Sequence, residues 1–238
     1  MSALTHMTFG DLDLAVINPH ARDTDYIYDE IFGRRIYDHP NLRVPANATI
    51  LDAGANIGLY SLWAAHEYRP RAIFAYEASP VTFGYLADNV GRLIAPDTTR
   101  AHCINRAVSA KSGMELVLQQ APLVSGISTM LDPSKVPWVR DLQRSGDLVS
   151  HKTMTTTISD EMAAHGIGQV DILKIDVEGH FMEVLAGITD ADFGRIANIV
   201  LEADYLEALG LTEAKICAFL GGKGYTAEAR DLTVYAWR

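Results

Sequence analysis

Three charged side chains alternate along an otherwise apolar stretch of the chain, at Lys174, Asp176 and Glu178. Alternate residues of a strand point to the same face of its sheet, so these three would share one face. Charges on one face of a buried strand are costly unless they pair with one another or serve a site. A carboxylate there can orient or deprotonate a hydroxyl group, and a lysine can hold it in place. The pattern predicts a catalytic cluster, with a purely structural ion-pair network as the alternative.

Further titratable residues lie close to this cluster. His180 follows it directly, and the ordinary pKa of histidine, about 6.5, suits a general base. A packing role is the alternative for His180. Glu202 and Asp204 end the next predicted strand and can join the cluster. Asp176, Glu202 and Asp204 can then hold Mg²⁺, because a hard cation prefers oxygen ligands. No spacing demands a metal, so the sequence favours a metal-free site.

A second motif, Asp52-x-Gly54-x-Asn56-x-Gly58, joins a predicted strand to a predicted helix. Glycines at such a turn let backbone amides approach a ligand closely. The G-x-G-x-x-G spacing of a dinucleotide fold is absent, which argues against an NAD-dependent oxidoreductase. A carboxylate at Asp52 repels a pyrophosphate but suits the cationic amino acid end of S-adenosylmethionine. The motif therefore predicts that Asp52, Gly54, Asn56 and Gly58 bind this cofactor.

Two strand ends that follow the glycine turn can complete a nucleoside site. Glu77 ends the next predicted strand, 23 residues after Gly54, and can accept hydrogen bonds from both ribose hydroxyls. Ala78 follows in the same turn. Asn105 ends the third predicted strand, where it can pair with the adenine base or cap a turn. We expect Glu77, Ala78, Asn105 and Asp176 to contact the cofactor.

These residues need a sheet to bring them together. From Ala48 onward, short β-rich runs alternate with helical stretches, which indicates a parallel α/β sheet. The predicted strands lie at 49–52, 72–77, 102–108, 170–177, 196–202, 225–230 and 233–237, and the predicted helices at 59–68, 80–94, 159–165, 181–185 and 212–220. This order predicts a doubly wound, mostly parallel seven-stranded sheet with an antiparallel C-terminal strand. Ligands bind beyond the carboxyl ends of such strands.

The remaining segments are predicted to cover the site. Residues 1–47 form an N-terminal extension, with a hairpin over 5–17 and a helix over 26–37, and one domain follows over 48–238. Within that domain, residues 113–152 form an excursion, with a hairpin over 113–131 and a polar surface stretch over 132–152. Several aromatic residues can wall an apolar acceptor, or form ordinary core or a subunit contact: Tyr26, Tyr28, Phe32, Tyr37 and Trp138. Arginines that can meet an anionic acceptor are Arg34, Arg35 and Arg140.

Composition limits the classes of protein. The 238 residues are 48% hydrophobic and 21% charged, which is typical of one globular domain. The chain has 20 basic and 30 acidic residues and a net charge of −10, so a broad nucleic-acid-binding face is not expected. No apolar run approaches the about 18–20 residues of a membrane helix, and no secretory signal opens the chain. Cys103 and Cys217 form no disulfide framework or metal spacing. We expect a cytoplasmic protein without a membrane partner; a homodimer stays open.

The segments LDAGANIGLYS, YEASP, INRAVS and DILKIDVEG, with a following VLAG, resemble the FkbM-type S-adenosylmethionine-dependent methyltransferases over about residues 48–203. This resemblance implies a Rossmann-like class I methyltransferase fold. It also implies O-methylation of a hydroxyl group on a small natural product or saccharide. Two positions depart from the family pattern: Phe181 stands where a glutamate is frequent, and Ala203-Asp204 follow Glu202 where a histidine is frequent. The competing hypotheses are an NAD-dependent oxidoreductase and a non-catalytic binding module that retains the fold.

Overall fold

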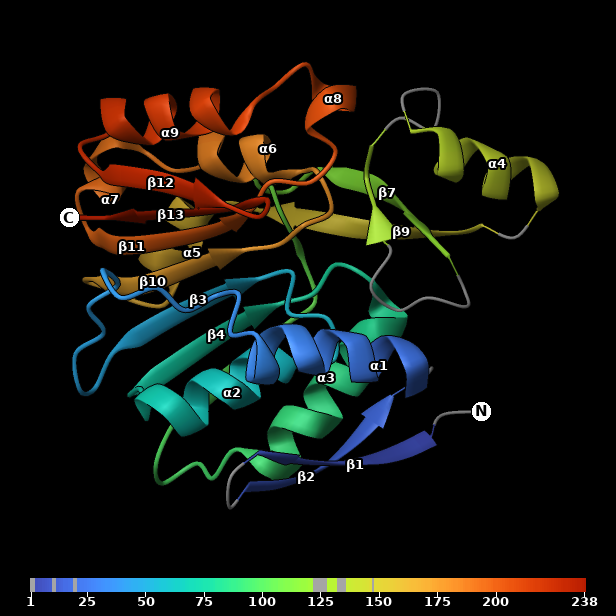
Figure 1. Ribbon diagram of the computed structural model, residues 1–238, viewed down its shortest axis with the longest axis horizontal. Helices are drawn as coiled ribbons and strands as arrows, with labels where there is room; N and C mark the ends of the chain where they lie inside the picture. The colour runs from blue at the N-terminus through green and yellow to red at the C-terminus, as the bar shows by residue number, and fades with distance from the viewer. Residues whose placement is uncertain (1–2, 10–11, 19–20, 122–127, 132–135, 147) are drawn as a thin grey trace.

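The computed structural model describes residues 3–9, 12–18, 21–121, 128–131, 136–146 and 148–238. Its central sheet has seven strands in the order β12-β13-β11-β10-β3-β4-β5 (Figure 1). β13 runs antiparallel to both of its neighbours, and the other neighbouring strands are parallel. The strands are β3 (Thr49–Ala53), β4 (Ala72–Tyr76), β5 (Arg100–Ile104), β10 (Val170–Ile175), β11 (Ile196–Glu202), β12 (Thr226–Arg230) and β13 (Thr233–Trp237). The predicted doubly wound sheet with an antiparallel C-terminal strand is confirmed.

Helices cover both faces of this sheet (Figure 1). Side chains alternate along the central strands, so Leu51 and Leu173 enter one core while Ile50 and Ile172 enter the other. All four side chains are fully buried, as expected for strands covered on both faces. One face carries α2 (Leu59–Tyr68) and α3 (Pro80–Leu93). The other carries α5 (Ile158–Ala164), α6 (Phe181–Ala186), α7 (Asp190–Phe193) and α9 (Glu213–Gly222), with α8 (Leu206–Leu209) after β11.

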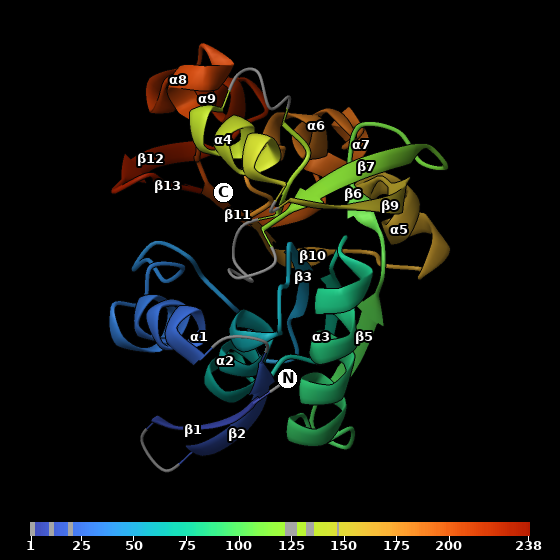
Figure 2. The same cartoon turned by 90° about the vertical axis from the view of Figure 1, so that its right-hand side faces the viewer.

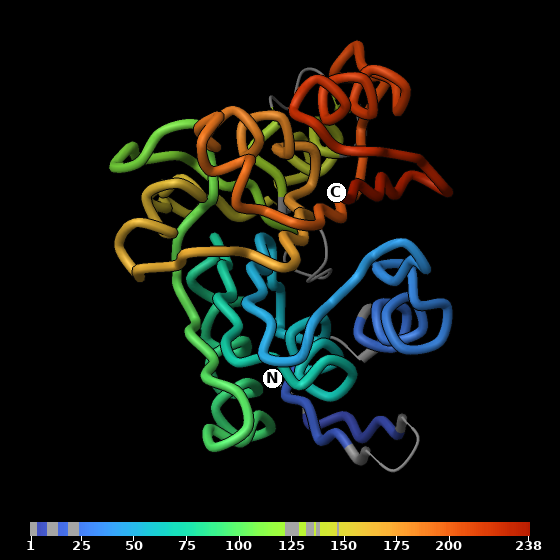
Figure 3. Tube along the Cα trace, turned by 90° about the vertical axis from the view of Figure 1, so that its left-hand side faces the viewer, coloured from blue at the N-terminus to red at the C-terminus, as the bar shows by residue number. Residues whose placement is uncertain are grey.

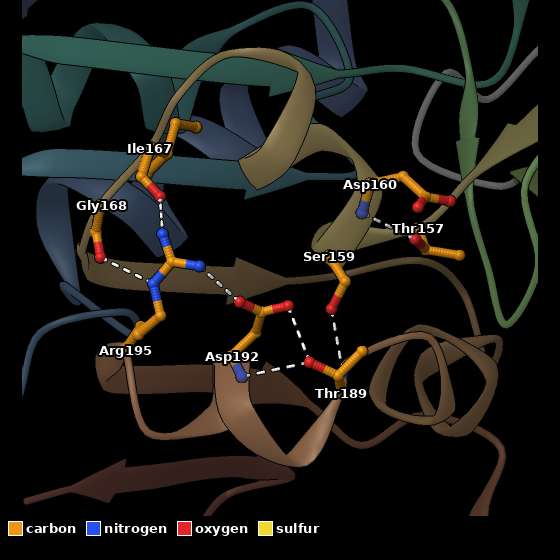
Figure 4. A network of polar contacts seen from close by, with 8 residues as sticks. All are labelled: Thr157, Ser159, Asp160, Ile167, Gly168, Thr189, Asp192 and Arg195. Atoms are coloured by element: carbon orange, nitrogen blue, oxygen red, sulfur yellow. Dashed lines mark hydrogen bonds and ion pairs between the residues drawn. The ribbon is translucent and has the colours of Figure 1, made fainter.

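A polar network fixes the helices on the second face at the amino ends of β10 and β11 (Figure 4). Thr157 caps α5 and Thr189 caps α7, each by accepting a hydrogen bond from a backbone N–H of its helix. The backbone N–H of Thr189 donates to the hydroxyl of Ser159 at 2.9 Å, which ties α7 to α5. Arg195, just before β11, pairs with Asp192 at 2.7 Å and donates to the carbonyl of Gly168 at 2.8 Å. The opposite ends of these strands are left for the site.

The N-terminal segment packs outside α2 and α3 (Figures 2 and 3). The predicted hairpin is present as β1 (Ala3–Phe9) and β2 (Leu12–Asn18). Asn89 of α3 accepts a hydrogen bond from the N–H of Ile17 at 2.7 Å and donates to its carbonyl at 2.9 Å. α1 (Ala21–Tyr28) continues as a π-helical turn, η1 (Asp29–Gly33). The predicted bounds 26–37 are therefore wrong, because the helical segment ends at Gly33 and Arg35 adopts a φ of +54°.

A second, four-stranded sheet lies beyond the carboxyl ends of the central strands (Figure 2). It comprises β6 (Ala107–Val108), β7 (Glu115–Gln120), β8 (Ser128–Thr129) and β9 (Val149–Thr156). The predicted strand over 102–108 is wrong in its bounds, because β5 ends at Ile104 and Ala107–Val108 pair with β9 instead. The predicted hairpin over 113–131 is present where β7 meets β8, and β7 also pairs with β9 along its length. The polar stretch 132–152 contains α4 (Pro137–Ser145).

Candidate active site

A cavity of about 350 Å³ opens where the carboxyl ends of β3, β4 and β10 meet. This is the position at which the strand order reverses, between β3 and β10. α1 and η1 form the opposite wall, and Leu118 and Met130 reach it from the second sheet. The lining includes the segments 54–57, 76–78, 106–108 and 176–178, together with Tyr26, Ile27, Glu30, Ile31, Tyr37, Lys174 and Glu202. Most of the residues predicted from the sequence therefore meet at one cavity.

The turn after β3 requires a glycine at its first position. Gly54 has a φ of +80°, and a Cβ atom there would lie 1.6 Å from the carbonyl oxygen of Asp176. The turn is thus pressed against the end of β10, and its N–H groups at Gly54 and Ala55 donate to the carbonyl of Tyr76. Gly58 begins α2 with a φ of +96° and packs against Leu86, outside the cavity lining. The predicted glycine motif shapes the cavity, with Gly54 and Asn56 in its wall.

Glu77 lies in the cavity wall at the end of β4. Its carboxylate accepts hydrogen bonds from the N–H groups of Asn56 at 3.0 Å and Ser79 at 2.7 Å. Burial raises the pKa of Glu77 to about 7, although both hydrogen bonds oppose the shift. An ionised carboxylate has about four acceptor positions, so capacity remains for hydroxyl groups of a ligand. The amide of Asn105 donates to the backbone carbonyls of Glu77 and Ala78, so it caps this turn and stays outside the lining.

Lys174 connects the glycine turn to the predicted catalytic residues. Its ammonium lies 3.2 Å from Asp52, 3.3 Å from Asp176, and donates to the carbonyl of Gly54 at 2.8 Å. Burial disfavours the charge, but Asp52 and Asp176 outweigh it and raise the pKa of Lys174. Asp52 is fully buried and also accepts a hydrogen bond from Ser61 at 2.7 Å. Asp52, predicted to face the cofactor, thus lies beneath the cavity rather than in its lining.

Three carboxyl groups gather at the ends of β10 and β11. Asp176, Glu202 and Asp204 each place one oxygen within 4.8 Å of the others. The hydroxyl of Tyr37 lies 2.9 Å from Asp176 and 2.8 Å from Glu202. The charge of Asp176, together with burial, raises the pKa of Glu202 to about 8. Burial and Asp176 likewise raise the pKa of Asp204 to about 7. The cluster therefore retains protons near neutral pH.

The two residues that follow Asp176 in the predicted cluster have different surroundings. Glu178 lines the cavity and accepts a hydrogen bond from the hydroxyl of Tyr205 at 2.9 Å. Burial and the charge of Asp176 raise the pKa of Glu178 well above its usual range. His180 instead pairs with Ser109 at 2.9 Å, outside the cavity lining, and burial lowers its pKa. The structure therefore separates His180 from the other predicted catalytic residues.

The aromatic and basic residues of the N-terminal segment divide between several roles. Tyr26 and Tyr37 line the cavity, whereas Phe32 is buried in the core and stacks on Tyr28. Arg34 pairs with Asp29 and Glu30, Arg35 pairs with Asp38 and Glu67, and Arg140 lies near Asp141. None of these three arginines belongs to the lining formed by the described residues, so their predicted contact with an anionic acceptor has no support. The side chain of Trp138 lies outside the described part of the structure.

Known proteins are similar to this chain in sequence and in fold. Residues 52–226 match the family described as the methyltransferase FkbM domain. The chain is 31% identical over 221 residues to methyltransferase sdnD of Sordaria araneosa, covering 85% of this chain and 82% of that protein. It is 29% identical over 240 residues to the 31-O-demethyl-FK506 methyltransferase FkbM of Streptomyces tacrolimicus, covering 93% and 89%. The crystal structure of methyltransferase FkbM from Methylobacillus flagellatus KT aligns with a TM-score of 0.53 at 14% identity, over 84% of this chain and 46% of that chain.

The strand order and the glycine turn define the Rossmann-like class I fold of S-adenosylmethionine-dependent methyltransferases. The family match spans most of the chain, from the last residues of β3 to the start of β12. The chain belongs to the FkbM methyltransferase family, and its cofactor is S-adenosylmethionine. Among the described residues, no helix has both the length and the apolar character needed to cross a membrane.

Proposed function

We propose that this methyltransferase acts on a hydroxyl group of a small natural product or saccharide. The observation that carries the proposal is Asp176, a carboxylate in the cavity wall beside the glycine turn, held by Lys174 and Tyr37. The names of two relatives support the acceptor class. One is a 31-O-demethyl-FK506 methyltransferase, and another, 28% identical over 141 residues, is the hexuronic acid methyltransferase AglP of Haloferax volcanii.

The residues of the cavity fit S-adenosylmethionine. Bound S-adenosylmethionine would supply an electrophilic methyl group on a sulfonium. Glu77 would accept hydrogen bonds from the ribose hydroxyls, with the acceptor positions that Asn56 and Ser79 leave free. Gly54 lets the backbone of its turn approach the ligand closely. Asp52 would act indirectly, by holding Lys174 beneath this turn.

Asp176 is the proposed proton acceptor. In the reaction the acceptor oxygen forms the new bond to the methyl carbon, the bond from that carbon to sulfur breaks, and the hydroxyl proton passes to Asp176. A methylated acceptor, S-adenosylhomocysteine and one proton result. Lys174 holds Asp176 in place for this step, since its ammonium lies 3.3 Å from the carboxylate. Glu178 is a second candidate, because it lines the same cavity.

We propose that the reaction is metal-free. The oxygen of Asp176 that contacts Tyr37 also faces the ammonium of Lys174, and Glu202 contacts Tyr37. Mg²⁺ held by Asp176, Glu202 and Asp204 would displace these contacts. Activity that persists in a chelator supports the metal-free site, whereas restoration of a lost activity by Mg²⁺ would overturn it.

The proposed setting is the cytoplasm, with neither nucleic acid nor membrane as a partner. The net charge of −10 supports the absence of these two partners, because a negatively charged protein is repelled by nucleic acid and by an anionic membrane surface. Two further points stay predictions: that residues 1–47 cover the substrate, and that the protein forms a homodimer. Sedimentation of the purified protein tests the homodimer.

Cofactor binding and methyl transfer test the proposed function separately. We expect S-adenosylmethionine and S-adenosylhomocysteine to bind in calorimetric titrations and NAD not to bind. A metabolite extract incubated with the protein and a methyl-labelled donor should yield a labelled methyl ether, identified by mass spectrometry. Label carried on nitrogen or carbon would reject O-methylation. Tight cofactor binding with no transfer to any metabolite would favour a non-catalytic module.

A further inference from the structure

Tyr37 joins the N-terminal segment to the carboxylates of the cavity. It precedes the region that matches the family, yet it lines the cavity and is only 5% exposed. Its hydroxyl lies at hydrogen-bond distance from both Asp176, 139 residues later, and Glu202, 165 residues later. A side chain from outside residues 52–226, which match the family, thus contacts the proposed proton acceptor.

The two hydrogen bonds of Tyr37 need two protons. A phenol hydroxyl carries one hydrogen and can donate it to only one carboxylate. The other contact is a hydrogen bond only if a protonated carboxyl group donates to the phenol oxygen. Asp176 forms an ion pair with Lys174 at 3.3 Å, whereas the described residues give Glu202 no ion pair. With Asp176 as the ion-paired carboxylate, the arrangement that makes both contacts hydrogen bonds has Glu202 donate to Tyr37 and Tyr37 donate to Asp176.

The ring of Tyr37 is held in place by its neighbours. It packs edge-on against Tyr60, with ring centroids 5.3 Å apart, and the ammonium of Lys174 lies 5.3 Å from its centroid. The backbone beside it is anchored separately, because the hydroxyl of Tyr235 donates to the carbonyl of Ile36 at 2.6 Å. The direction of the Tyr37 hydroxyl is consequently fixed before any acceptor binds.

Both contacts of Asp176 fall on the same oxygen. Tyr37 and Lys174 each approach Oδ2, so Oδ1 keeps its lone pairs for another donor. We propose that Tyr37 is a positioning residue for methyl transfer: its hydroxyl, bridging Glu202 and Asp176, fixes the carboxylate so that Oδ1 receives the acceptor hydroxyl. This inference rests on the proposed role of Asp176 as proton acceptor.

The substitution Tyr37→Phe removes the hydroxyl and keeps the ring. We expect kcat to fall by about 10- to 100-fold, the effect of losing a hydrogen bond to a charged group. The acceptor KM and the S-adenosylmethionine Kd should each stay within about twofold, because the ring contacts persist. The matched control is Tyr28→Phe, which removes a phenol hydroxyl of the same segment that donates to the backbone carbonyl of Thr8, outside the cavity lining. Equal kcat values for the two variants would overturn the inference.

An infrared measurement needs no acceptor and separates this inference from the proposed function. At neutral pH the wild-type protein should show the absorption of a protonated carboxyl group that Glu202→Gln lacks. The same band should shift in Tyr37→Phe, because its hydrogen-bond partner is gone, and should keep its position in Tyr28→Phe. A wild-type spectrum that matches Glu202→Gln in this region, or a band that Tyr37→Phe leaves in place, would overturn the shared-proton arrangement.

Discussion

Asp176 combines a half-buried position in the cavity wall with two fixed partners on one oxygen. The substitution Asp176→Asn keeps the shape of the side chain and removes its ability to take a proton. We expect turnover to fall by about 100- to 10,000-fold, the usual contribution of a general base. The S-adenosylmethionine Kd should change little, because Glu77 and the glycine turn remain. Label transfer and calorimetry measure the two quantities.

A control for this substitution lies on the same strand. Asp171, near the amino end of β10, accepts a hydrogen bond from the N–H of Thr49 at 2.8 Å. In Asp171→Asn the amide oxygen can still accept this bond, so normal turnover is expected. Unchanged turnover in Asp176→Asn would remove Asp176 from the role of proton acceptor.

Asp52 and Glu77 were both predicted to bind the cofactor, but their surroundings call for different outcomes. Glu77→Ala should weaken S-adenosylmethionine binding by about 1–3 kcal/mol, because it removes a hydrogen-bonded acid from the cavity wall. Asp52→Ala should lower the free energy of unfolding by about 3–5 kcal/mol, because it leaves the charge of Lys174 buried without this partner. Calorimetry and denaturant unfolding measure the two effects. If Asp52→Ala were as stable as the wild type but bound S-adenosylmethionine more weakly, the result would support a direct contact between Asp52 and the cofactor.

At the scale of elements, the turn between β3 and α2 depends on its close approach to β10. In Gly54→Ala the added Cβ would meet the carbonyl oxygen of Asp176 at a φ that alanine rarely adopts. We expect this variant to lose S-adenosylmethionine binding and to unfold at a lower temperature. Gly84→Ala is the control, because Gly84 lies inside α3 with nothing within 4 Å of an added Cβ. That change should stabilise the protein by about 0.5–1 kcal/mol. Normal binding by Gly54→Ala would contradict the required close approach.

Elements with strong local signals could be predicted from the sequence. α2 has the predicted bounds, and α3 starts at Pro80, directly after the Ser79 cap, as expected. The break between β5 and β6 could not be predicted, since it depends on the bond from Asn105 to Glu77 and on pairing with β9. Both partners are distant in the sequence, so local periodicity carries no sign of them.

The same limit applies to the site. The charges of Lys174, Asp176 and Glu178 could be found because they stand out in an apolar stretch, although the predicted strand over 170–177 is wrong in its end: β10 ends at Ile175, and Asp176 and Glu178 follow it. The bridge made by Tyr37 could not, because its partners follow 139 and 165 residues later. The position of Asp52 beneath the cavity depends on the pairing of β3 with β10, which places it opposite Lys174. The spacing of the motif predicts the turn, but it does not predict whether the Asp52 carboxylate contacts the cofactor or Lys174.

At the scale of the whole molecule, the N-terminal segment is tied to α3 and to the edge of the central sheet formed by β12 and β13. Asn89 holds the hairpin to α3, and Tyr235 of β13 holds Ile36. His39 stacks on Tyr235 and pairs with Glu228 of β12 at 2.8 Å. The segment between these anchors supplies Tyr26, Ile27, Glu30, Ile31 and Tyr37 to the cavity. The cavity therefore takes part of its lining from outside residues 52–226, which match the family.

The acidic groups of the cavity also set how the stability of the protein depends on pH. Burial raises the pKa of Glu77 to about 7, and the charge of Asp176 with burial raises that of Glu202 to about 8. In the unfolded chain both return to about 4.3, so between these values the folded state holds protons that the unfolded state has lost. The free energy of unfolding must then fall as pH rises through this window. We expect the ligand-free protein to melt at a lower temperature at about pH 8.5 than at about pH 5.5. Glu202→Gln, neutral at every pH, should show a flatter profile in the same fluorimetric scan; a melting temperature that rises over this range would contradict the raised pKa values.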